Sequence, residues 1–355
     1  MNHAVLTQIL KLARWAPSGD NQQPWAFEIA GDHCIKIHGF DTRDHILYDY
    51  LGRASHIAHG ALLETLRIAA TRFALRATWE LSSSGDDRNP IYTVTLVPDP
   101  GLAPDPLVDF IEERTVQRRP MKTTPLTSTQ RQALLEAVGK DFTVQLFEQA
   151  SERLSVAKLL WSSAKIRLTC PEAYQVHMDA IEWRASTSKD RIPDQAVGVD
   201  PVTARLMEWV MKSWNRVEFF NRFLLGTVAP RIQLDLLPPL FCAAHVLIQP
   251  KSAPVQLTDW VNAGVAVQRV WLTATRLGLH LQPQMTPVIF RWYARDGCHF
   301  SAKPELFQQA LKVSDSIEGF ANATQSDHFA FFARIGISQP PKSRSTRKDL
   351  VALMK

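Results

Sequence analysis

The chain of 355 residues is 45% hydrophobic and 21% charged, so it can bury one large core or two ordinary ones, and disordered and fibrous classes are excluded. Its 40 lysine and arginine residues against 35 acidic residues leave a formal charge of +5, an excess too modest and too dispersed to favour a nucleic-acid partner. The longest apolar run, 240–248, is far shorter than the roughly 20 residues of a membrane span, so we expect no membrane partner.

The first hundred residues predict the order helix, strands, helix, strands. The expected elements are a helix ending at Trp15, strands at 25–30 and 34–38, a helix at 54–73, and strands at 77–81 and 91–97 joined by the polar loop 82–89.

A proline-rich connector around DPGLAPDP, in residues 98–106, predicts a boundary between a first half at 1–105 and a second half at 106–355. The elements expected in the second half are helices at 106–113, 128–138, 151–168 and 257–277 and strands at 143–148, 240–248, 279–282, 288–293 and 330–337. Residues 171–226 are rich in tryptophan and phenylalanine and have no counterpart in the first half. They predict a helical insertion, broken by the polar stretch 186–200.

A weak internal repeat links the two halves. The segments ATRFAL at 70–75 and ATRLGL at 274–279 agree at four of six positions, and the same offset of 204 residues aligns Gly60 with Gly264. Chance is the alternative, because these residue types are common in helices. The similar order of elements in the halves favours a divergent duplication.

The four cysteines, Cys34, Cys170, Cys242 and Cys298, lie far apart without a CxxC pair. This spacing argues against a disulfide framework and a cysteine zinc site, and it predicts a cytoplasmic protein. His56 and His59 stand three apart on a predicted helix, but no third ligand follows at a suitable spacing, so we expect no metal.

The segment APSGDNQQPW at 16–25 is the most informative in the chain. Ser18 and Asn21 form turns, Gly19 permits tight turning, and Pro17 and Pro24 stiffen the two ends. Such a loop presents polar groups at fixed positions, although an ordinary connection between a helix and a strand is the alternative.

The pattern APSxxNxQPW, between an amphipathic helix and a strand, resembles the nitroreductase-like flavoprotein family, in which this loop contacts FMN. Further segments are similar to the family: RTVQRRP at 114–120 to its arginine-rich phosphate-binding segment, 274–279 to the helix end before its cofactor strand, and 334–347 to its closing strand, proline turn and terminal arginine. The resemblance implies an α+β fold of the nitroreductase type, with FMN as the cofactor.

The order of these segments differs from ordinary members, in which the arginine-rich segment comes first and two chains grip each FMN. Here the loop at 16–25 precedes the arginine-rich segment at 114–120. A single chain that fuses both partners explains this order, and it implies a pseudo-dimer with one flavin site. The arrangement is similar to the single-chain duplicated nitroreductases and to modules associated with ThiF-type adenylating enzymes.

The resemblance assigns the cofactor contacts residue by residue. The candidates for the FMN phosphate are Arg114, Arg118 and Arg347, with Arg344 in reserve, since guanidinium groups meet a phosphate best. Asn21 and Gln23 are expected at the polar edge of the flavin ring, Pro17 and Ser18 near the ribityl oxygens, and Gln282 and Pro283 against the reactive side of the flavin. Taken singly, the arginines also fit a solvated turn and a mobile basic tail.

The implied function is an FMN-dependent oxidoreductase that takes hydride from NAD(P)H or an organic substrate and reduces a small conjugated acceptor. The usual glycine and glutamate of the family are missing around Gln282–Gln284. The alternative is therefore a non-catalytic flavin-fold protein that stores flavin or docks a partner enzyme. Tryptophan and phenylalanine side chains of 171–226 would cover the flavin or, equally, pack the insertion together.

Overall fold

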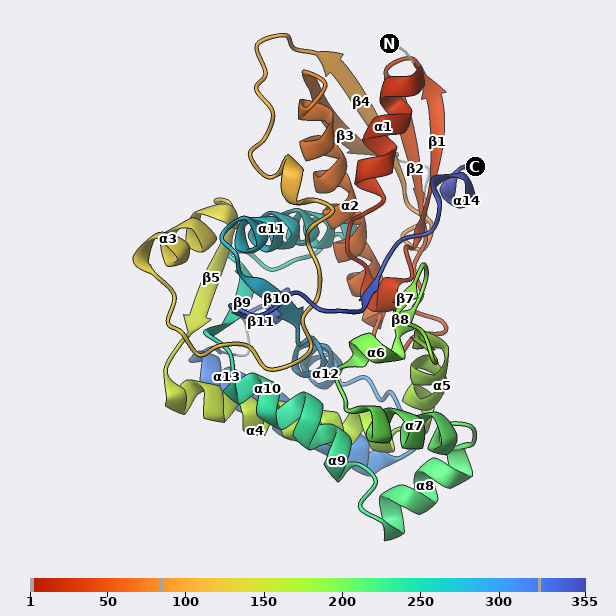
Figure 1. Ribbon diagram of the computed structural model, residues 1–355, viewed down its shortest axis with the longest axis vertical. Helices are drawn as coiled ribbons and strands as arrows, with labels where there is room; N and C mark the ends of the chain where they lie inside the picture. Colours follow the sequence, from red (N-terminus) through yellow and green to blue (C-terminus); the bar gives the residue numbers. More distant parts are fainter. Residues whose placement is uncertain (1–2, 83–85, 325–326) are drawn as a thin grey trace.

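The computed structural model describes residues 3–82, 86–324 and 327–355, and it has an α+β fold with two separate four-stranded sheets (Figure 1). The first sheet contains β1 (Trp25–Gly31), β2 (Cys34–Gly39), β3 (Leu75–Leu81) and β4 (Ile91–Pro98), in the order β1-β2-β4-β3. All its pairings are antiparallel. Alternate residues Tyr92, Val94 and Leu96 of β4 are buried, as expected for a sheet with one covered face.

Two helices accompany the first sheet: α1 (His3–Ala13) and α2 (Arg53–Thr71). The predicted helices and strands of this half are confirmed to within a few residues at their ends. The predicted loop at 82–89 includes residues 83–85, which lie outside the described residues. The predicted helix at 106–113 is wrong, because only the short 3₁₀ turn η3 (Val108–Phe110) forms after the proline-rich connector.

The second sheet contains β5 (Phe142–Phe147), β9 (Ala244–Pro250), β10 (His280–Pro283) and β11 (Phe331–Gly336), in the order β10-β11-β9-β5. Its pairings are antiparallel as well. Every residue of β11 is buried, so this central strand is covered on both faces. The helices of this half are α3 (Ser128–Ala137), α4 (Ala150–Thr169), α11 (Leu257–Arg276), α12 (Thr286–Arg295) and α13 (Pro304–Ala321).

The strand predicted at 288–293 is wrong, since these residues lie inside α12. A short apolar run suits a buried strand and a buried helix equally well, and Pro287 at the start of the segment favours the helix. The strand predicted at 240–248 begins only at Ala244, because Leu237–Leu240 forms the short helix α10. Helix α13 was not among the elements predicted from the sequence.

The insertion is mostly helical, as predicted, and its short elements continue beyond the predicted end at residue 226 to Leu236. Its longer helices lie at one end of the molecule (Figure 1). Its elements are α5 (Pro171–Ala180), β6 (Ile181–Glu182), β7 (Thr187–Ser188), β8 (Ile192–Pro193), α6 (Asp194–Val197), α7 (Pro201–Val210), α8 (Trp214–Phe223), α9 (Val228–Arg231) and η4 (Ile232–Leu236). Neither α7 nor α8 has a buried residue.

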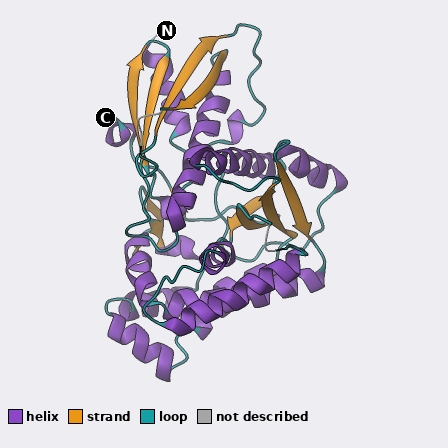
Figure 2. Ribbon diagram, turned by 180° about the vertical axis from the view of Figure 1, so that it is seen from behind, coloured by secondary structure: helices purple, strands orange, loops and turns teal. Residues whose placement is uncertain are grey.

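Helices α2 and α11 cross in close contact between the two sheets (Figure 2). A Cβ atom on Gly60 would lie 1.8 Å from the backbone oxygen of Val261, and one on Gly264 would lie 1.9 Å from that of Ile57. Only glycine permits such an approach of two backbones. The crossing therefore fixes how the two halves meet.

The chain after β11 returns to the first sheet. Its two-residue strand β12 (Arg344–Ser345) pairs with β7 of the insertion, and the backbone NH of Lys355 donates to the oxygen of Phe27 in β1 at 2.8 Å. This closing segment thus crosses the molecule and joins all three of its parts. Within the described residues, no helix combines the length and the apolar character that crossing a bilayer requires.

Candidate functional site

The loop between α1 and β1 holds three non-glycine residues in the left-handed region of the backbone. The φ angles are 46° at Asp20, 64° at Asn21 and 55° at Gln23. This conformation costs an L-residue about 1 kcal/mol or more, so it needs support from elsewhere. The loop provides some of that support itself, because the hydroxyl of Ser18 accepts a hydrogen bond from the NH of Gln23 at 2.9 Å.

The side chain of Gln23 provides most of the remaining support. Its amide donates to the oxygens of Asn21 at 2.9 Å and Lys189 at 2.8 Å, and its oxygen accepts from the NH of Lys348 at 2.9 Å. Gln23 therefore ties the loop to the insertion and to the closing segment. These bonds occupy its polar atoms, and Gln23 is not among the residues that line the cavity described next.

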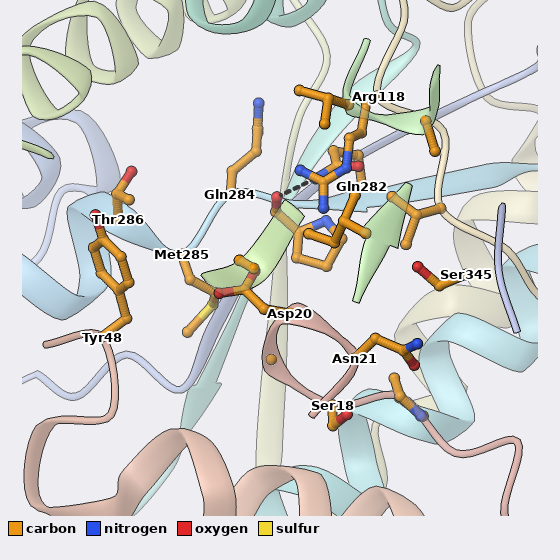
Figure 3. Close-up of a pocket in the computed structure, with 18 of the residues that line it drawn as sticks. Ser18, Asp20, Asn21, Tyr48, Arg118, Gln282, Gln284, Met285, Thr286 and Ser345 are labelled. Atoms are coloured by element: carbon orange, nitrogen blue, oxygen red, sulfur yellow. Dashed lines mark hydrogen bonds between the residues drawn. The ribbon is translucent and has the colours of Figure 1, made fainter. Parts of the chain in front are cut away.

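A cavity of about 470 Å³ opens beside this loop, a size typical of small-molecule sites (Figure 3). Nine of the ten predicted site residues line it: Pro17, Ser18, Asn21, Arg114, Arg118, Gln282, Pro283, Arg344 and Arg347. They come from the first loop, the segment after the connector, β10 and the closing segment. The fold thus brings residues more than 300 positions apart into one cavity.

The insertion contributes apolar walls to the cavity, including Ile181, Met207, Met211 and Leu234. The aromatic residues that the sequence analysis considered for this role lie elsewhere: none of Trp183, Trp209, Trp214, Phe219, Phe220 and Phe223 lines the cavity. Trp209, Phe219 and Phe223 are instead exposed and contact other rings of α7 and α8.

Arg114, Arg344 and Arg347 form an arginine cluster at one end of the cavity. None of the three has an acidic partner within the described ranges of the chain. Arg114 and Arg347 donate instead to the backbone oxygens of Trp15 and Ala16, at 2.9 and 3.0 Å. Burial and, next, the neighbouring guanidiniums lower the pKa of Arg114 well below its usual value and that of Arg347 to about 9.

The arginine cluster is held by aromatic rings and has donors to spare. Arg114 stacks on Trp271 at 4.6 Å, and Arg344 stacks on Trp15 at 5.1 Å. The buried Nε atoms of Arg114 and Arg344 have no hydrogen-bond partner, and neither has the indole NH of Trp271. Concentrated positive charge with unused donors is the arrangement that an anionic group such as a phosphate requires.

Arg118 lies apart from the arginine cluster. The segment that carries Arg114 and Arg118 runs beside β10, where Val116 forms a bridge with Leu281. Extended residues four apart point to the same side but stand about 13 Å from each other. The charges that act on Arg118 are accordingly Asp20 and Arg167, and not the arginine cluster.

Five further side chains that line the cavity were not singled out from the sequence, and two of them, Asp20 and Arg167, act electrostatically on Arg118: Asp20, Tyr48, Arg167, His177 and Asp235. Together with Arg118 we call them the mixed-charge group. Arg167 pairs with Asp235 at 2.6 Å, and the hydroxyl of Tyr48 lies 2.8 Å from Nε2 of His177. Burial lowers the pKa of His177 to about 3, so the imidazole is neutral at pH 7. The cavity thus has two chemically different ends.

Gln282, Pro283 and Gln284, at the end of β10, also line the cavity, and Gln282 lies near Arg118 (Figure 3). The side-chain amide of Gln282 donates to the oxygen of Pro283 at 2.8 Å, while its own oxygen is buried without a partner. Asn21 has a similar pattern, with its amide 3.3 Å from the oxygen of Arg191 and its Oδ1 unpaired. Both amides therefore keep an acceptor for a ligand.

The two histidines considered for a metal have other partners. Nε2 of His56 lies 3.0 Å from the oxygen of Asp87, and Nε2 of His59 lies 2.8 Å from that of Pro24. Burial lowers the pKa of His59 to about 4. His59 thus supports the end of the 16–25 loop.

Comparison with known proteins gives distant relatives. No family model matches the chain. The chain is 25% identical over 347 residues to an uncharacterized protein of Mycobacterium tuberculosis (strain CDC 1551 / Oshkosh), a match that covers 94% of this chain and 46% of that protein. The chain therefore spans about half the length of this curated relative.

Solved structures similar to this chain include an iodotyrosine deiodinase, a nitroreductase and a nitroreductase-like family protein. A crystal structure of iodotyrosine deiodinase bound to FMN and 3-iodo-L-tyrosine is 15% identical, with a TM-score of 0.37 over 68% of this chain and 95% of that one. The FMN-dependent nitroreductase NfnB from Mycobacterium smegmatis, in complex with NADPH, is 11% identical, with a TM-score of 0.37 over 69% and 95%. A nitroreductase-like family protein from Bacillus cereus is 10% identical, with a TM-score of 0.36 over 71% and 95%.

Proposed function

We propose that the chain binds FMN in this cavity and acts as an FMN-dependent oxidoreductase of the nitroreductase type. The proposal rests on the buried Arg114 and Arg347 and the half-buried Arg344, none of which forms an ion pair within the described residues, beside the loop that carries APSxxNxQPW. A buried charge without a partner is costly, so a fold that places two of them beside a third arginine implies an anionic ligand. The phosphate of FMN carries such a charge.

The polar atoms left unpaired in the cavity fit FMN from end to end. Arg114 and Arg344 offer free Nε donors to the phosphate. Asn21 and Gln282 offer free acceptors farther along, where the ribityl hydroxyls and the ring NH are donors. Arg118 belongs to the mixed-charge group, and we assign it to the ring rather than to the phosphate. When bound, FMN supplies hydride and electron transfer, and the protein groups hold it and exclude water.

We propose further that the two halves are divergent copies fused into a pseudo-dimer. When the strands of each sheet are counted along the chain, both sheets have the spatial order first, second, fourth, third. In each half one long helix, α2 or α11, connects the second strand to the third. At the offset of 204, Gly60 corresponds to Gly264 and Ile57 to Val261. The contact of Gly60 with Val261 therefore has its counterpart in the contact of Gly264 with Ile57. In the same way, Glu64 corresponds to Gln268 and Thr65 to Arg269, and the hydrogen bond of Gln268 to Thr65 has its counterpart in that of Arg269 to Glu64. Reciprocal contacts of this kind are the signature of a two-fold axis.

A flavin absorbance spectrum with stoichiometry tests the proposal. We expect one FMN per chain, bleaching of the yellow protein by NADH or NADPH, and reoxidation by a quinone or a nitroaromatic compound. A yellow protein that neither reductant bleaches would favour flavin storage. A colourless protein that does not take up added FMN would favour docking of a partner enzyme and would remove the flavin site.

The affinity for FMN is expected to depend on pH in a defined way. A bound phosphate favours the protonated form of Arg347, so affinity falls as pH rises through about 9, where free Arg347 loses its proton. Affinity also falls below pH 6 or so, because a phosphate monoester takes up its second proton there. Fluorescence titrations with FMN between pH 5 and pH 10 or so measure both limbs. Riboflavin, which lacks the phosphate, is the control, and an FMN affinity that tracks that of riboflavin would contradict the assignment of the arginine cluster.

A further inference from the structure

Asp20 is an acidic side chain of the mixed-charge group, and it forms no ion pair or hydrogen bond with any of the residues that the structure describes. It lines the cavity, and its residue is half-buried at the tip of the strained loop (Figure 3). The other members of the group are already matched, Arg167 with Asp235 and Tyr48 with His177. Arg118 attracts Asp20 electrostatically but forms no ion pair with it. A carboxylate in this position is costly unless a ligand satisfies it.

The loop fixes the direction of this carboxylate. Asp20 has a φ of 46°, and the residues on either side of it are held through Ser18 and Gln23. Burial raises the pKa of Asp20 above its usual value, and its neighbours Arg118 and Arg167 counteract part of that shift. A cationic group bound beside the carboxylate would favour its ionised form further.

The charged group left for a substrate depends on which partners the members of the mixed-charge group already have. This step rests on the proposed function, in which Arg118 holds the flavin ring. Arg118 then directs its donors to the flavin ring and Arg167 directs its own to Asp235, so the carboxylate of Asp20 is the charged group left without a hydrogen-bond partner among the described residues. The insertion faces this point with apolar side chains, among them Met207, Met211 and Leu234. The subsite therefore combines one carboxylate with apolar walls.

We propose that the substrate end of the cavity selects a compact conjugated molecule that carries a protonated amine, and that Asp20 is the residue that determines this specificity. The amine donates to the Asp20 carboxylate, and the conjugated part lies against the apolar walls of the insertion. An anionic substituent in the same position meets the carboxylate and is rejected. The subsite thus distinguishes molecules of equal size by charge.

Three nitroaromatic compounds of nearly equal size test this selectivity: 4-nitrobenzylamine, 4-nitrobenzyl alcohol and 4-nitrobenzoate. Their dissociation constants for the FMN-loaded, full-length protein are measured by titration calorimetry without reductant, so the readout is binding alone. We expect the amine to bind about 10-fold or more tightly than the alcohol, because it forms a charge-assisted hydrogen bond, and the benzoate to bind most weakly. Equal affinities, or tightest binding of the benzoate, would overturn the proposal.

The variant Asp20→Asn isolates the charge, because asparagine tolerates the left-handed backbone as well as aspartate does. We expect it to keep its FMN and to lose the preference for the amine. Asp190→Asn is the matched control, since Asp190 is exposed and does not line the cavity. A preference for the amine that survives in Asp20→Asn would refute the role of Asp20. Absence of FMN from the unmodified protein would instead refute the proposed function, so the two failures are distinguishable.

Discussion

Replacement of Arg114 by methionine is expected to raise the dissociation constant for FMN by about 10- to 150-fold. A hydrogen bond to a charged group contributes about 1.5–3 kcal/mol, which corresponds to that range. Methionine keeps the length and the apolar stem that pack against Trp271, and it removes the guanidinium with its free Nε. Titration of the apoprotein with FMN, followed by flavin fluorescence, measures the change.

Arg119→Met is the matched control in the same segment. Arg119 is exposed, donates to the oxygen of Gln195 at 3.1 Å, and does not line the cavity. We expect its FMN affinity to stay within about two-fold of the unmodified protein, as for a surface substitution. Arg344→Met should resemble Arg114→Met, because both lose a donor of the arginine cluster. If Arg114→Met and Arg119→Met bind FMN equally well, the arginine cluster does not hold the phosphate.

Most of the helices and strands could be predicted because their burial repeats with the period of the element. The alternation in β4 and the buried face of α1, formed by Leu6, Ile9, Leu10 and Ala13, are examples. The prediction failed where the spacing of hydrophobic residues does not distinguish a helix from a strand or is overridden by neighbouring residues. Residues 288–293 are apolar or aromatic except for Arg291, and burial of five consecutive residues, 288–292, conceals whether the run is a helix or a strand. At 106–113 the helical pattern was present, but it followed a connector rich in proline and formed only a single turn.

The candidate site could be predicted only where a continuous motif carries it. Nine of the ten residues taken from the motifs line the cavity. The tenth, Gln23, belongs to the motif for a different reason, because it holds the loop in a left-handed conformation. A residue can thus be tied to a site by the backbone it supports, and sequence does not separate that role from contact with the ligand.

The rest of the site had no signal in the sequence. Tyr48, Arg167, His177 and Asp235 come from four segments that meet only in the folded chain. Asp20 occupies one of the variable positions of APSxxNxQPW, so the pattern says nothing about its charge. These positions form the end of the cavity at which we place the substrate, and local propensity does not fix their identity.

The internal repeat, in contrast, has a physical reason at its strongest point. Ala74 and Gly278, which the offset of 204 aligns, both follow the end of a helix and both have a positive φ, 52° and 72°. A residue in the left-handed region is a common way to end a helix. The repeated ATRxxL therefore marks the same turn from helix to strand in each half, which supports a shared origin over coincidence.

Substitution of Gly60 by alanine is expected to reduce the free energy of unfolding by about 3 kcal/mol. Its Cβ would lie 1.8 Å from the backbone oxygen of Val261, and a backbone atom cannot move aside as a flexible side chain can. Helices α2 and α11 must separate to accept the methyl group, so the contacts on both sides of the crossing suffer. Denaturant unfolding of the purified variant measures the effect.

Gly264→Ala should lose a similar amount, because its Cβ meets the backbone oxygen of Ile57 at 1.9 Å. The double variant should lose less than the sum of the two, since one separation of the helices makes room for both methyl groups. Gly319→Ala is the control within a helix: nothing lies within 4 Å of its Cβ, and the exchange should stabilise α13 by about 0.5–1 kcal/mol. If Gly60→Ala is tolerated as well as Gly319→Ala, the two halves do not meet through this crossing, and the reciprocal contacts that support a fused pseudo-dimer lose their basis.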